Sequence, residues 1–472
     1  MSIKKFYATK DTTITNAYKE DLKTRATDAN MGLSDSLEVF FIYGQNPDPD
    51  ATDAQKREES RILVYPNLQD IQTYYGASSA PSDTKFVLRL FNAKHPFTLP
   101  KNFTLNLYHF DDNWLEGHGL DMESYKDVGA PNWTERQAGA NWTNGEGAID
   151  ISAPPADSLV GTKTFDTGDE DLEIDITSFL STNWLSLDWG DTAFLITFTS
   201  TESAGSINFY TKKFFSRSSE FFFKRPIIEA RSANAIGDDR GKFYKASQLA
   251  TSNIQSLYLY NTVSGARENI TPAPTLKLFS DSTLDTLIGT ASVTNPETGV
   301  YKGTITIGSD VPVTTIYEEW KAETTTIKTG PIKLLTREPE TNAGEIDYVV
   351  DITNMKSSYS REETAKFRVY TRVKDWNPTI YTVASKELEN NIVEKIYYKI
   401  VRMVDDETVI DYGIGTTLLN NDHTLASYDA LGSYFDFDMS LLESGYMYGI
   451  KLMFSVNGEL LEQPETFKFR VD

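Results

Sequence analysis

The chain has no cysteine and only four histidines among its 472 residues. The lack of cysteine excludes disulfides, thiolate catalysis and cysteine-ligated zinc sites. The sequence contains no G-x-S-x-G, P-loop or G-x-G-x-x-G pattern, so it predicts neither triad hydrolysis nor nucleotide binding. The histidines show no HExxH or His-x-His spacing and therefore predict no zinc site; they are His95, His109, His118 and His423.

Long apolar runs are also missing. No stretch of about 18 apolar residues is available for a membrane span. The opening residues, MSIKKFYATKDTTIT, lack the apolar centre of a cleaved export signal. We therefore expect a protein that is made in the cytoplasm of its host, so that any role outside the cell needs a release step such as lysis.

Positive charge is scarce relative to negative charge. The 45 basic and 68 acidic residues give a formal net charge of −23. A field of this sign repels phosphate backbones and anionic membranes, so neither nucleic acid nor a membrane is an expected partner. The acidic charge instead suits a protein that must stay soluble while concentrated in an assembly, or that faces a basic patch on another protein.

The chain is rich in aromatic residues, with 25 Tyr and 26 Phe. Alternating apolar and polar positions, bounded by turn residues, predict strands throughout, and an all-β fold; the clearest runs are 37–43, 85–91, 103–110 and 194–200. Helical periodicity is confined to two short segments, 60–71 and 175–185, the second with Asp175 or Thr177 as its cap.

Composition shifts divide the chain into three predicted domains. Small, glycine and charged residues gather around 229–245, and 337–345 is polar and rich in turn residues, as expected of linkers. The predicted domains are a jelly-roll sandwich over 1–235 and two immunoglobulin-like β-sandwiches over 245–338 and 345–472. In the last of these, Val-Asn-Gly at 456–458 predicts a tight hairpin, because Asn-Gly tolerates positive φ angles.

The first domain carries a series of motifs in a characteristic order: ATKDTTITNAY, NMGLSDSLEVF, KFVLRLF, WLEGHG, PNWTERQAGANW, LEIDITSFLSTNWL and FFFKRPIIEA. Over about residues 4–232 this order resembles the DNRLRE-type (disaggregatase-related) jelly-roll domain, which is also similar to some carbohydrate-binding modules. The resemblance implies an ordered loop that closes one end of the sandwich, with Trp114, Trp133 and Trp142 as wedges. The polar insertion at 44–59 departs from the family pattern, and we expect it to be an exposed excursion that can contact a neighbour.

The tryptophan-rich stretch 114–142 has two further interpretations. Carboxylates surround Trp114, and paired acids beside aromatic residues are what a glycosidase needs; these acids are Asp111, Asp112, Glu116, Asp121 and Glu123. Hard oxygen ligands for calcium are available in DDNWLE and in 168–175, although neither matches the EF-hand loop. Solvated loop acids are the preferred interpretation because acids are abundant along the whole chain, so no catalytic, cofactor-binding or metal-ligating residue is predicted.

The third domain has a resemblance of its own. The segments SSYSREETAKFRVYTRVKDWNP, EKIYYKIVRMVDD and the terminal FKFRVD look like the C-terminal module of virion structural proteins of tailed phages, over about 346–472. The resemblance implies a part of the particle and does not imply an enzyme.

Together these observations predict a non-enzymatic structural component of a tailed-phage virion, namely a neck, collar or tail adaptor or decoration. Its expected partners are other virion proteins and copies of itself, and it would be assembled in the host cytoplasm and released by lysis without any cofactor. The alternative is a glycan-binding protein that recognises a cell-surface polysaccharide through Trp114, Trp133 and Trp142, used as a flat platform for sugar rings. Buried packing is the commoner role of tryptophan in a sandwich, which favours the structural hypothesis.

Overall fold

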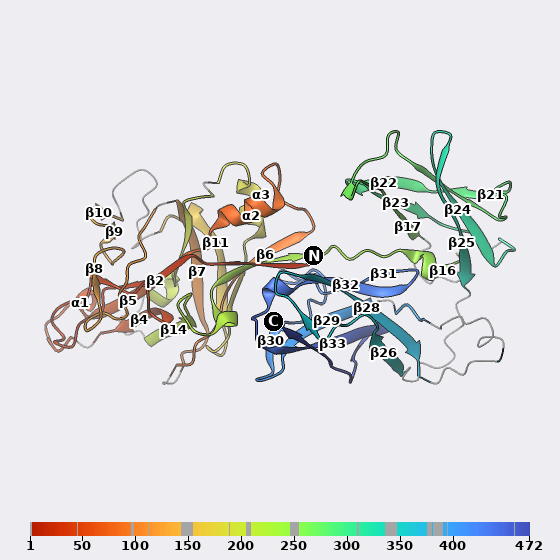
Figure 1. Cartoon of the computed structure of the whole chain (residues 1–472). Helices are drawn as coiled ribbons and strands as arrows, with labels where there is room; N and C mark the ends of the chain where they lie inside the picture. The colour runs from red at the N-terminus through yellow and green to blue at the C-terminus, as the bar shows by residue number, and fades with distance from the viewer. Residues whose placement is uncertain are drawn as a thin grey trace. The chain divides into compact units, whose positions relative to one another are not determined.

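The computed structural model of the chain (Figure 1) describes residues 2–44, 46–95, 99–111, 113–142, 154–187, 189–203, 209–245, 254–308, 311–335, 347–374, 380, 390–393, 395–456 and 458–472. The chain forms two compact units. The first contains residues 1–233 together with 414–423, and the second contains residues 234–413 and 424–472.

The first unit is a sandwich of two antiparallel sheets. One sheet has the order β1 (Ile3–Tyr7), β15 (Ile227–Ser232), β6 (Thr84–Leu90) and β12 (Leu172–Asp175). The larger sheet has the order β11 (Leu159–Phe165), β7 (Phe103–Asp111), β13 (Thr192–Phe198), β5 (Arg57–Tyr65), β4 (Ser36–Tyr43) and β14 (Phe209–Phe215), with β2 (Lys10–Thr15) also paired to β5.

The connectivity of eight of these strands is that of a jelly roll. Along the chain β1, β5, β6 and β7 alternate between the sheets, and β11, β12, β13 and β15 do so again. The resulting facing orders, β1-β15-β6-β12 and β5-β13-β7-β11, are two interlocked Greek keys. The predicted jelly-roll fold is therefore confirmed, with β2, β4 and β14 extending the larger sheet.

The core of the first unit lies between the two sheets. Leu88 from β6 belongs to the same buried cluster as Leu105 from β7 and Ile196 from β13. Because successive strand residues point to opposite faces, the alternating pattern seen in the sequence places every second side chain in this core. The strands predicted at 37–43, 85–91, 103–110 and 194–200 agree with β4, β6, β7 and β13, apart from one or two residues at their ends.

Helix is limited to short segments of the first unit: α1 (Asp53–Lys56), α2 (Leu68–Tyr75), α3 (Thr177–Asn183) and α4 (Ser200–Ser203). The helix predicted for 60–71 is wrong over 60–65, because these residues form part of β5, buried on both faces, and the helix begins only after Pro66. A helix lies within the predicted 175–185, over Thr177–Asn183, but neither predicted residue is its N-cap, which is Ile176. The Asp175 carboxylate accepts a hydrogen bond from the Thr177 N–H at 2.8 Å. No helix among the described residues is long and apolar enough to cross a bilayer.

The insertion at 44–59 is only partly an excursion. Residues 47–50 are exposed, but the segment then forms α1 and enters β5, where Glu59 pairs with Phe41 of β4. Residues 414–423 belong to the same unit through hydrogen bonds to its strands. The Arg231 guanidinium donates to the Leu419 carbonyl at 2.7 Å, and the Asn421 amide donates to the Arg231 carbonyl at 2.6 Å.

The second unit contains two immunoglobulin-like sandwiches. In the first of them a three-stranded sheet, β17 (Gln255–Tyr260), β23 (Val300–Ile305) and β22 (Ser292–Glu297), packs on a sheet of β16 (Phe243–Tyr244), β25 (Thr325–Leu335), β24 (Thr315–Ala322), β20 (Thr275–Phe279) and β21 (Leu287–Thr290). A small hairpin, β18 (Thr262–Val263) and β19 (Ala266–Arg267), follows β17. The fully buried Trp320 lies in the core between these sheets.

The second sandwich has the same plan. One sheet contains β26 (Tyr348–Ile352), β28 (Thr364–Val373), β32 (Gly432–Asp438) and β31 (Ser427–Asp429). The other contains β27 (Ser358–Tyr359), β35 (Phe467–Val471), β33 (Met447–Val456), β29 (Lys395–Arg402) and β30 (Glu407–Ile410), with β34 (Glu459–Glu462) paired to β33. In both sandwiches a two-residue strand near the start runs parallel to the last strand: β16, the first strand of its sandwich, pairs with β25, and β27, the second strand of its sandwich, pairs with β35.

These sheets confirm the predicted all-β class. The hairpin predicted at 456–458 joins β33 to β34, and Gly458 has the positive φ of 85° that the turn requires. Asn457 lies outside the described residues, as does the predicted linker 337–345. The three domain boundaries at 1–235, 245–338 and 345–472 remain predictions.

Candidate functional site

The tryptophan-rich segment forms a cover on the outer face of the larger sheet in the first unit. Strands β5 and β13 are apolar on both faces, so Ile62 and Ile196 point into the core between the sheets while Leu63 and Leu195 point outward. Trp114 and Trp142 pack on these outward side chains and form a second buried cluster. The segment therefore has a packing role, as the sequence indicated. Its position differs from the prediction, because we expected it to close one end of the sandwich and it instead covers the outer face of the larger sheet.

One asparagine side chain holds this cover in place. Asn30 is fully buried on β3 (Ala29–Asn30), which pairs with β8 (Asp127–Val128) of the cover. Its amide nitrogen donates to the carbonyls of Glu116 (2.9 Å) and Pro131 (3.0 Å), and its oxygen accepts from the N–H of Gly119 at 3.2 Å and of Gly32. A single side chain thus binds backbone groups from two separate parts of the cover.

Two glycines allow the cover to approach Asn30. A β-carbon at Gly119 would lie 1.8 Å from the Asn30 carbonyl oxygen, and one at Gly117 would lie about 2 Å from the Asn30 side chain. Gly117 also has a φ of 76°, which disfavours any other residue. The Gly-His-Gly sequence of the loop is therefore explained by close backbone packing.

The three tryptophans differ in exposure. Trp114 and Trp142 are 1% and 2% exposed, and the Trp142 indole N–H donates to the Asn132 carbonyl at 2.8 Å. Trp133 is half-buried at the edge of the cluster, where the Arg61 guanidinium lies 4.8 Å from its ring centre. In this arrangement two of the three indole rings that were considered as a sugar platform have no face exposed to solvent.

A carboxylate pair anchors the start of the cover. The Glu116 carboxylate receives two hydrogen bonds from the Arg217 guanidinium and one from the backbone N–H of Asp11, at 2.9 Å. The Asp11 carboxylate in turn accepts from the backbone N–H of Arg217 at 2.6 Å. Glu116 and Asp11 therefore join three segments that are far apart in the sequence, and they do so by binding Arg217 and backbone groups.

Asp11 is the more perturbed of these two acids. Its side chain is buried, and burial raises its pKa from 3.8 to about 7, opposed by the hydrogen bond from Arg217 and assisted by the negative charge of Glu116. Protonation of Asp11 is therefore expected close to neutral pH. The perturbation arises from packing against the cover.

The remaining acids of the stretch bind separate partners. Asp111 accepts from the Thr192 hydroxyl at 2.5 Å, Asp121 accepts from the N–H groups of Glu123 and Tyr125, and the Glu123 carboxylate accepts from the Glu20 N–H. Asp112 lies outside the described residues. The structure thus distributes the described acids along the cover, each with its own hydrogen-bond partner.

The histidines are also dispersed. The exposed His118 lies 3.6 Å from the Asp127 carboxylate. His109 packs on Phe179, and burial lowers its pKa. His423 is buried, and burial together with the nearby Arg231 lowers its pKa to about 4. Within the described part of the chain, no group of three or more His, Asp or Glu side chains is placed to hold a metal ion.

A lysine side chain donates hydrogen bonds to backbone oxygen atoms of the acidic loop 168–175, which was considered as a calcium site. The fully buried Lys212 ammonium donates to the carbonyls of Gly168 (2.8 Å) and Glu170 (2.7 Å) and to the Asn92 side chain (2.6 Å). The Glu170 carboxylate accepts hydrogen bonds from the N–H groups of Asp166, Thr167 and Gly168. Burial works to raise the pKa of Glu170, but these hydrogen bonds outweigh it and hold the pKa at about 2.

Three apolar side chains of the cover point outward. Leu115, Leu120 and Tyr125 are 54%, 51% and 69% exposed, although the backbone that carries them is fixed by Asn30 and by a hydrogen bond from Leu120 to Tyr125. We call these three side chains the outer patch of the cover. A held backbone with exposed apolar groups is typical of protein-binding surfaces, because little conformational entropy is lost on binding.

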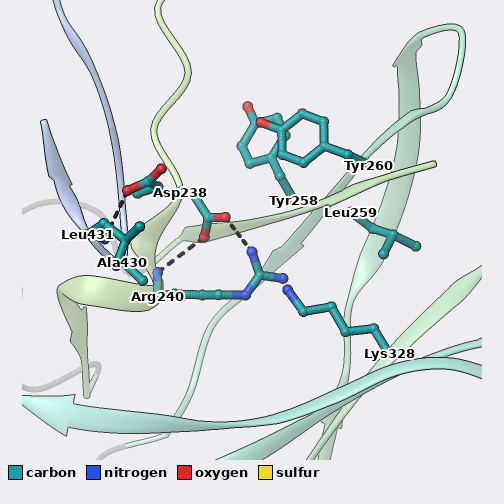
Figure 2. Close-up of a pocket in the computed structure, with 9 residues that line it drawn as sticks. Asp238, Arg240, Tyr258, Leu259, Tyr260, Lys328, Ala430 and Leu431 are labelled. Carbon is teal, nitrogen blue, oxygen red and sulfur yellow. Dashed lines mark hydrogen bonds and ion pairs between the residues drawn. The ribbon is translucent and has the colours of Figure 1, made fainter. Parts of the chain in front are cut away.

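The second unit contains a pocket of about 340 Å³ that the sequence did not predict. Tyr258 and Tyr260 of β17 line one side, Arg240 and Lys328 lie across from them, and residues 429–431 complete the wall (Figure 2). The Leu-Tyr-Leu-Tyr alternation of β17 could have predicted one side of this pocket, because two leucines that point into the core place the two tyrosines together on the outer face. The other residues come from segments far apart in the sequence.

No protein-family model and no curated protein matches the chain. Among solved structures, a titin structure (Titin-A168169) covers 50% of this chain and 94% of its own at 10% identity and a TM-score of 0.15. The tandem Ig repeats of Dlar cover 47% and 90% at 8% identity and a TM-score of 0.14. A Salmonella alpha-2-macroglobulin covers 93% of this chain, which matches only 26% of that protein, at 8% identity and a TM-score of 0.17. Scores this low add nothing to the strand orders above.

Replacing Gly119 by alanine is expected to detach the cover. The added methyl group cannot fit beside the Asn30 carbonyl, so the loop must move and expose Trp114 and Trp142. We expect a loss of about 2–4 kcal/mol in the free energy of unfolding and a red shift of tryptophan fluorescence. Gly129→Ala in the same loop is the control, because a β-carbon there meets no atom within 4 Å. Equal fluorescence and stability of the two variants would contradict this role of Gly119.

Asp11→Asn should change how stability depends on pH. The folded-state pKa of Asp11 is raised to about 7, so the stability contributed by its protonated form is present below about pH 4 and is lost as the pH rises through 7. Asparagine cannot ionise, so the variant does not lose this stability as the pH rises. The free energy of unfolding of the variant minus that of the parent should therefore be larger at pH 8 than at pH 5. The gain has an upper limit of about 4 kcal/mol, since one unit of pKa corresponds to about 1.4 kcal/mol.

Chemical unfolding at the two pH values measures this difference. Asp50→Asn serves as the control because Asp50 is exposed in the insertion. If the difference in stability between Asp11→Asn and the parent is the same at both pH values, the buried-acid account of Asp11 is incorrect.

Lys212→Met should destabilise the first unit strongly. It removes the ammonium and leaves two carbonyls and one amide oxygen without their donor in a buried environment. Leaving buried polar groups without partners predicts a loss of about 3–5 kcal/mol. The neighbouring Lys213→Met should cost less than about 1 kcal/mol, because the Lys213 side chain is partly exposed and its ion pair with the Glu38 carboxylate lies at the surface. Similar unfolding midpoints for the two variants would show that the hydrogen bonds of the Lys212 ammonium do not stabilise the first unit.

Proposed function

We propose that the chain is a non-enzymatic structural component of a tailed-phage virion, acting as an adaptor or decoration of the neck, collar or tail through protein–protein contacts. Its partners would be other virion proteins and copies of itself. The virion assignment comes from the resemblance of residues 346–472 to virion modules. The single structural observation that best supports a protein-binding role is the outer patch on the internally anchored cover.

The chemistry of the cover is consistent with this proposal. The side chains of Glu116, Asp11 and Asn30 form hydrogen bonds with backbone groups and with Arg217. These internal bonds hold the loop in place. Leu115, Leu120 and Tyr125 are exposed apolar groups on a side of the cover that also exposes polar residues such as His118 and Glu123. A fixed apolar patch on an acidic, soluble protein favours a specific protein partner, since desolvation of the patch contributes about 25 cal/mol per Å² of apolar area.

The alternative, glycan recognition through Trp114, Trp133 and Trp142, has less support. A sugar platform needs exposed ring faces, whereas Trp114 and Trp142 are covered by the cluster with Leu63 and Leu195. Trp133 alone is half-exposed, and Arg61 lies against its ring. A glycan array with the parent protein and Trp133→Ala tests this alternative directly, and binding that depends on Trp133 would favour it over the structural role.

Incorporation into particles tests the structural proposal. Mass spectrometry of purified particles should detect the chain in a fixed ratio to the major structural proteins. The double variant Leu120→Ser, Tyr125→Ser should reduce this ratio at least tenfold, because it removes apolar area from the outer patch without touching Asn30 or the glycines.

The control is Leu185→Ser, which replaces an apolar side chain that is 79% exposed elsewhere in the same unit. Thermal unfolding of all three proteins checks that folding is retained. Absence of the parent chain from every particle preparation would refute the structural role. Normal incorporation of the double variant would show that the outer patch is not the contact surface.

A further inference from the structure

We propose that the pocket of the second unit binds one neutral sugar residue of a glycan, with Tyr258 and Tyr260 as its recognition surface. The pocket lies outside the cover and its outer patch, so this proposal is independent of the structural function above. It rests on the groups left free in the pocket, on their charge balance and on the pocket size.

The free polar groups of the pocket are hydrogen-bond donors and acceptors without net charge. The hydroxyls of Tyr258 and Tyr260 have no hydrogen-bond partner among the described residues, and their rings lie 6.2 Å apart and nearly parallel. Burial raises the pKa of Tyr258 to about 12 and also raises that of Tyr260, so both phenols stay neutral. Each hydroxyl can therefore donate one hydrogen bond and accept others.

The charged groups of the pocket are already paired. The Arg240 guanidinium binds the Glu318 carboxylate through two hydrogen bonds of 2.8 and 2.7 Å, and it also contacts Asp238. Lys328 lies 3.4 Å from the same Glu318 carboxylate. The two acidic and two basic residues that line the pocket cancel in charge: Asp238, Asp429, Arg240 and Lys328. A ligand with a formal charge would meet a repulsive group, which favours a neutral ligand.

Some donor capacity of the cations remains. A guanidinium has five N–H bonds, and three of those of Arg240 have partners in the described structure. The two others, together with the partly exposed Lys328 ammonium, can donate to hydroxyl oxygens. In Figure 2 these groups lie across the pocket from the tyrosines. The Arg267 guanidinium lies 4.7 Å from the centre of the Tyr260 ring and the Lys302 ammonium 5.9 Å from that of Tyr258. The pocket therefore offers the tyrosine hydroxyls on one side and hydrogen-bond donors on the other.

This combination fits a sugar ring better than a peptide. At about 340 Å³ the pocket lies at the small end of ligand-binding sites, and residues 429–431 close one side of it. Extension of the sheet by a peptide at the edge strand β17 is hindered, because the Ser256 N–H is already bound by Asp239 at 2.7 Å and the Gln255 side chain is bonded to the backbone of Tyr244. A pyranose carries several neutral hydroxyls, which can bond both to the tyrosine hydroxyls and to the donors of Arg240 and Lys328.

Saturation-transfer NMR on the full chain tests the proposal, with the methyl glycosides of glucose, galactose, N-acetylglucosamine and rhamnose as probes. At least one glycoside should receive saturation from the protein. Tyr260→Ala should weaken its binding at least tenfold, and Tyr258→Phe, which removes only a hydroxyl, should weaken it about fivefold, as expected for one hydrogen bond.

Tyr74→Ala is the matched control, because Tyr74 is 46% exposed in the first unit and Tyr260 is 40% exposed. Thermal unfolding confirms that each variant is folded. Absence of saturation transfer to all four glycosides, or equal transfer to the parent and Tyr260→Ala, would overturn the proposal. Binding of a peptide library that is lost in Tyr260→Ala, without binding of any glycoside, would also overturn it and make the pocket a protein-docking site. None of these outcomes bears on the presence of the chain in virions.

Discussion

The larger sheet of the first unit is apolar on both faces, and this constraint determines how the tryptophan-rich segment must fold. Strand β13 sends Ile196 inward and Leu195 outward, and both side chains are fully buried. A sheet with two apolar faces needs two covers. The four-stranded sheet supplies one cover, and Trp114 and Trp142 supply the other. Burial of about 200 Å² per indole ring gives a gross contribution of several kcal/mol before the cost of ordering the loop.

The abundance of acids in and around the loops follows from the same need for order. Long loops leave many backbone N–H groups without partners in secondary structure, and such groups must be bonded if they are buried. Glu116 binds the Asp11 N–H, and Glu170 binds three successive N–H groups of its own loop. These carboxylates serve as acceptors for the backbone, which explains why a stretch rich in acids and tryptophans need not be an active site.

The strands were predictable because each depends mainly on its own local pattern. Alternation identified β4, β6, β7 and β13, and short helical periodicity over 175–185 with a capping residue at its start predicted α3. The helix expected at 60–71 was wrong over β5 because the apolar run Ile62–Val64, buried on both faces of the larger sheet, fits a helix equally well. Local patterns cannot separate these cases without knowledge of what covers the second face.

The candidate sites were less predictable, since they depend on contacts between residues far apart in the sequence. Asn30 reaches the Glu116 carbonyl across 86 positions, and Arg240 reaches Glu318 across 78. The Gly-His-Gly of the cover gave a visible signal, because paired glycines indicate close backbone approach, but the sequence did not identify Asn30 as the residue approached. Location of the tyrosine pocket required the positions of Arg240 and of residues 429–431 as well as the alternation in β17.

The two candidate surfaces differ in how they place their aromatic residues, and this difference separates their proposed roles. In the cover Trp114 and Trp142 are buried, and the exposed apolar groups are two leucine side chains and one tyrosine, which offer apolar area and few directional bonds. In the pocket the aromatic residues are themselves the lining, and their hydroxyls have no partner among the described residues. Apolar area suits a large protein partner, whose specificity comes from shape, whereas free hydroxyls beside a ring suit a small polar ligand whose orientation must be fixed. The two proposals are compatible, because the two surfaces lie in different units of the chain.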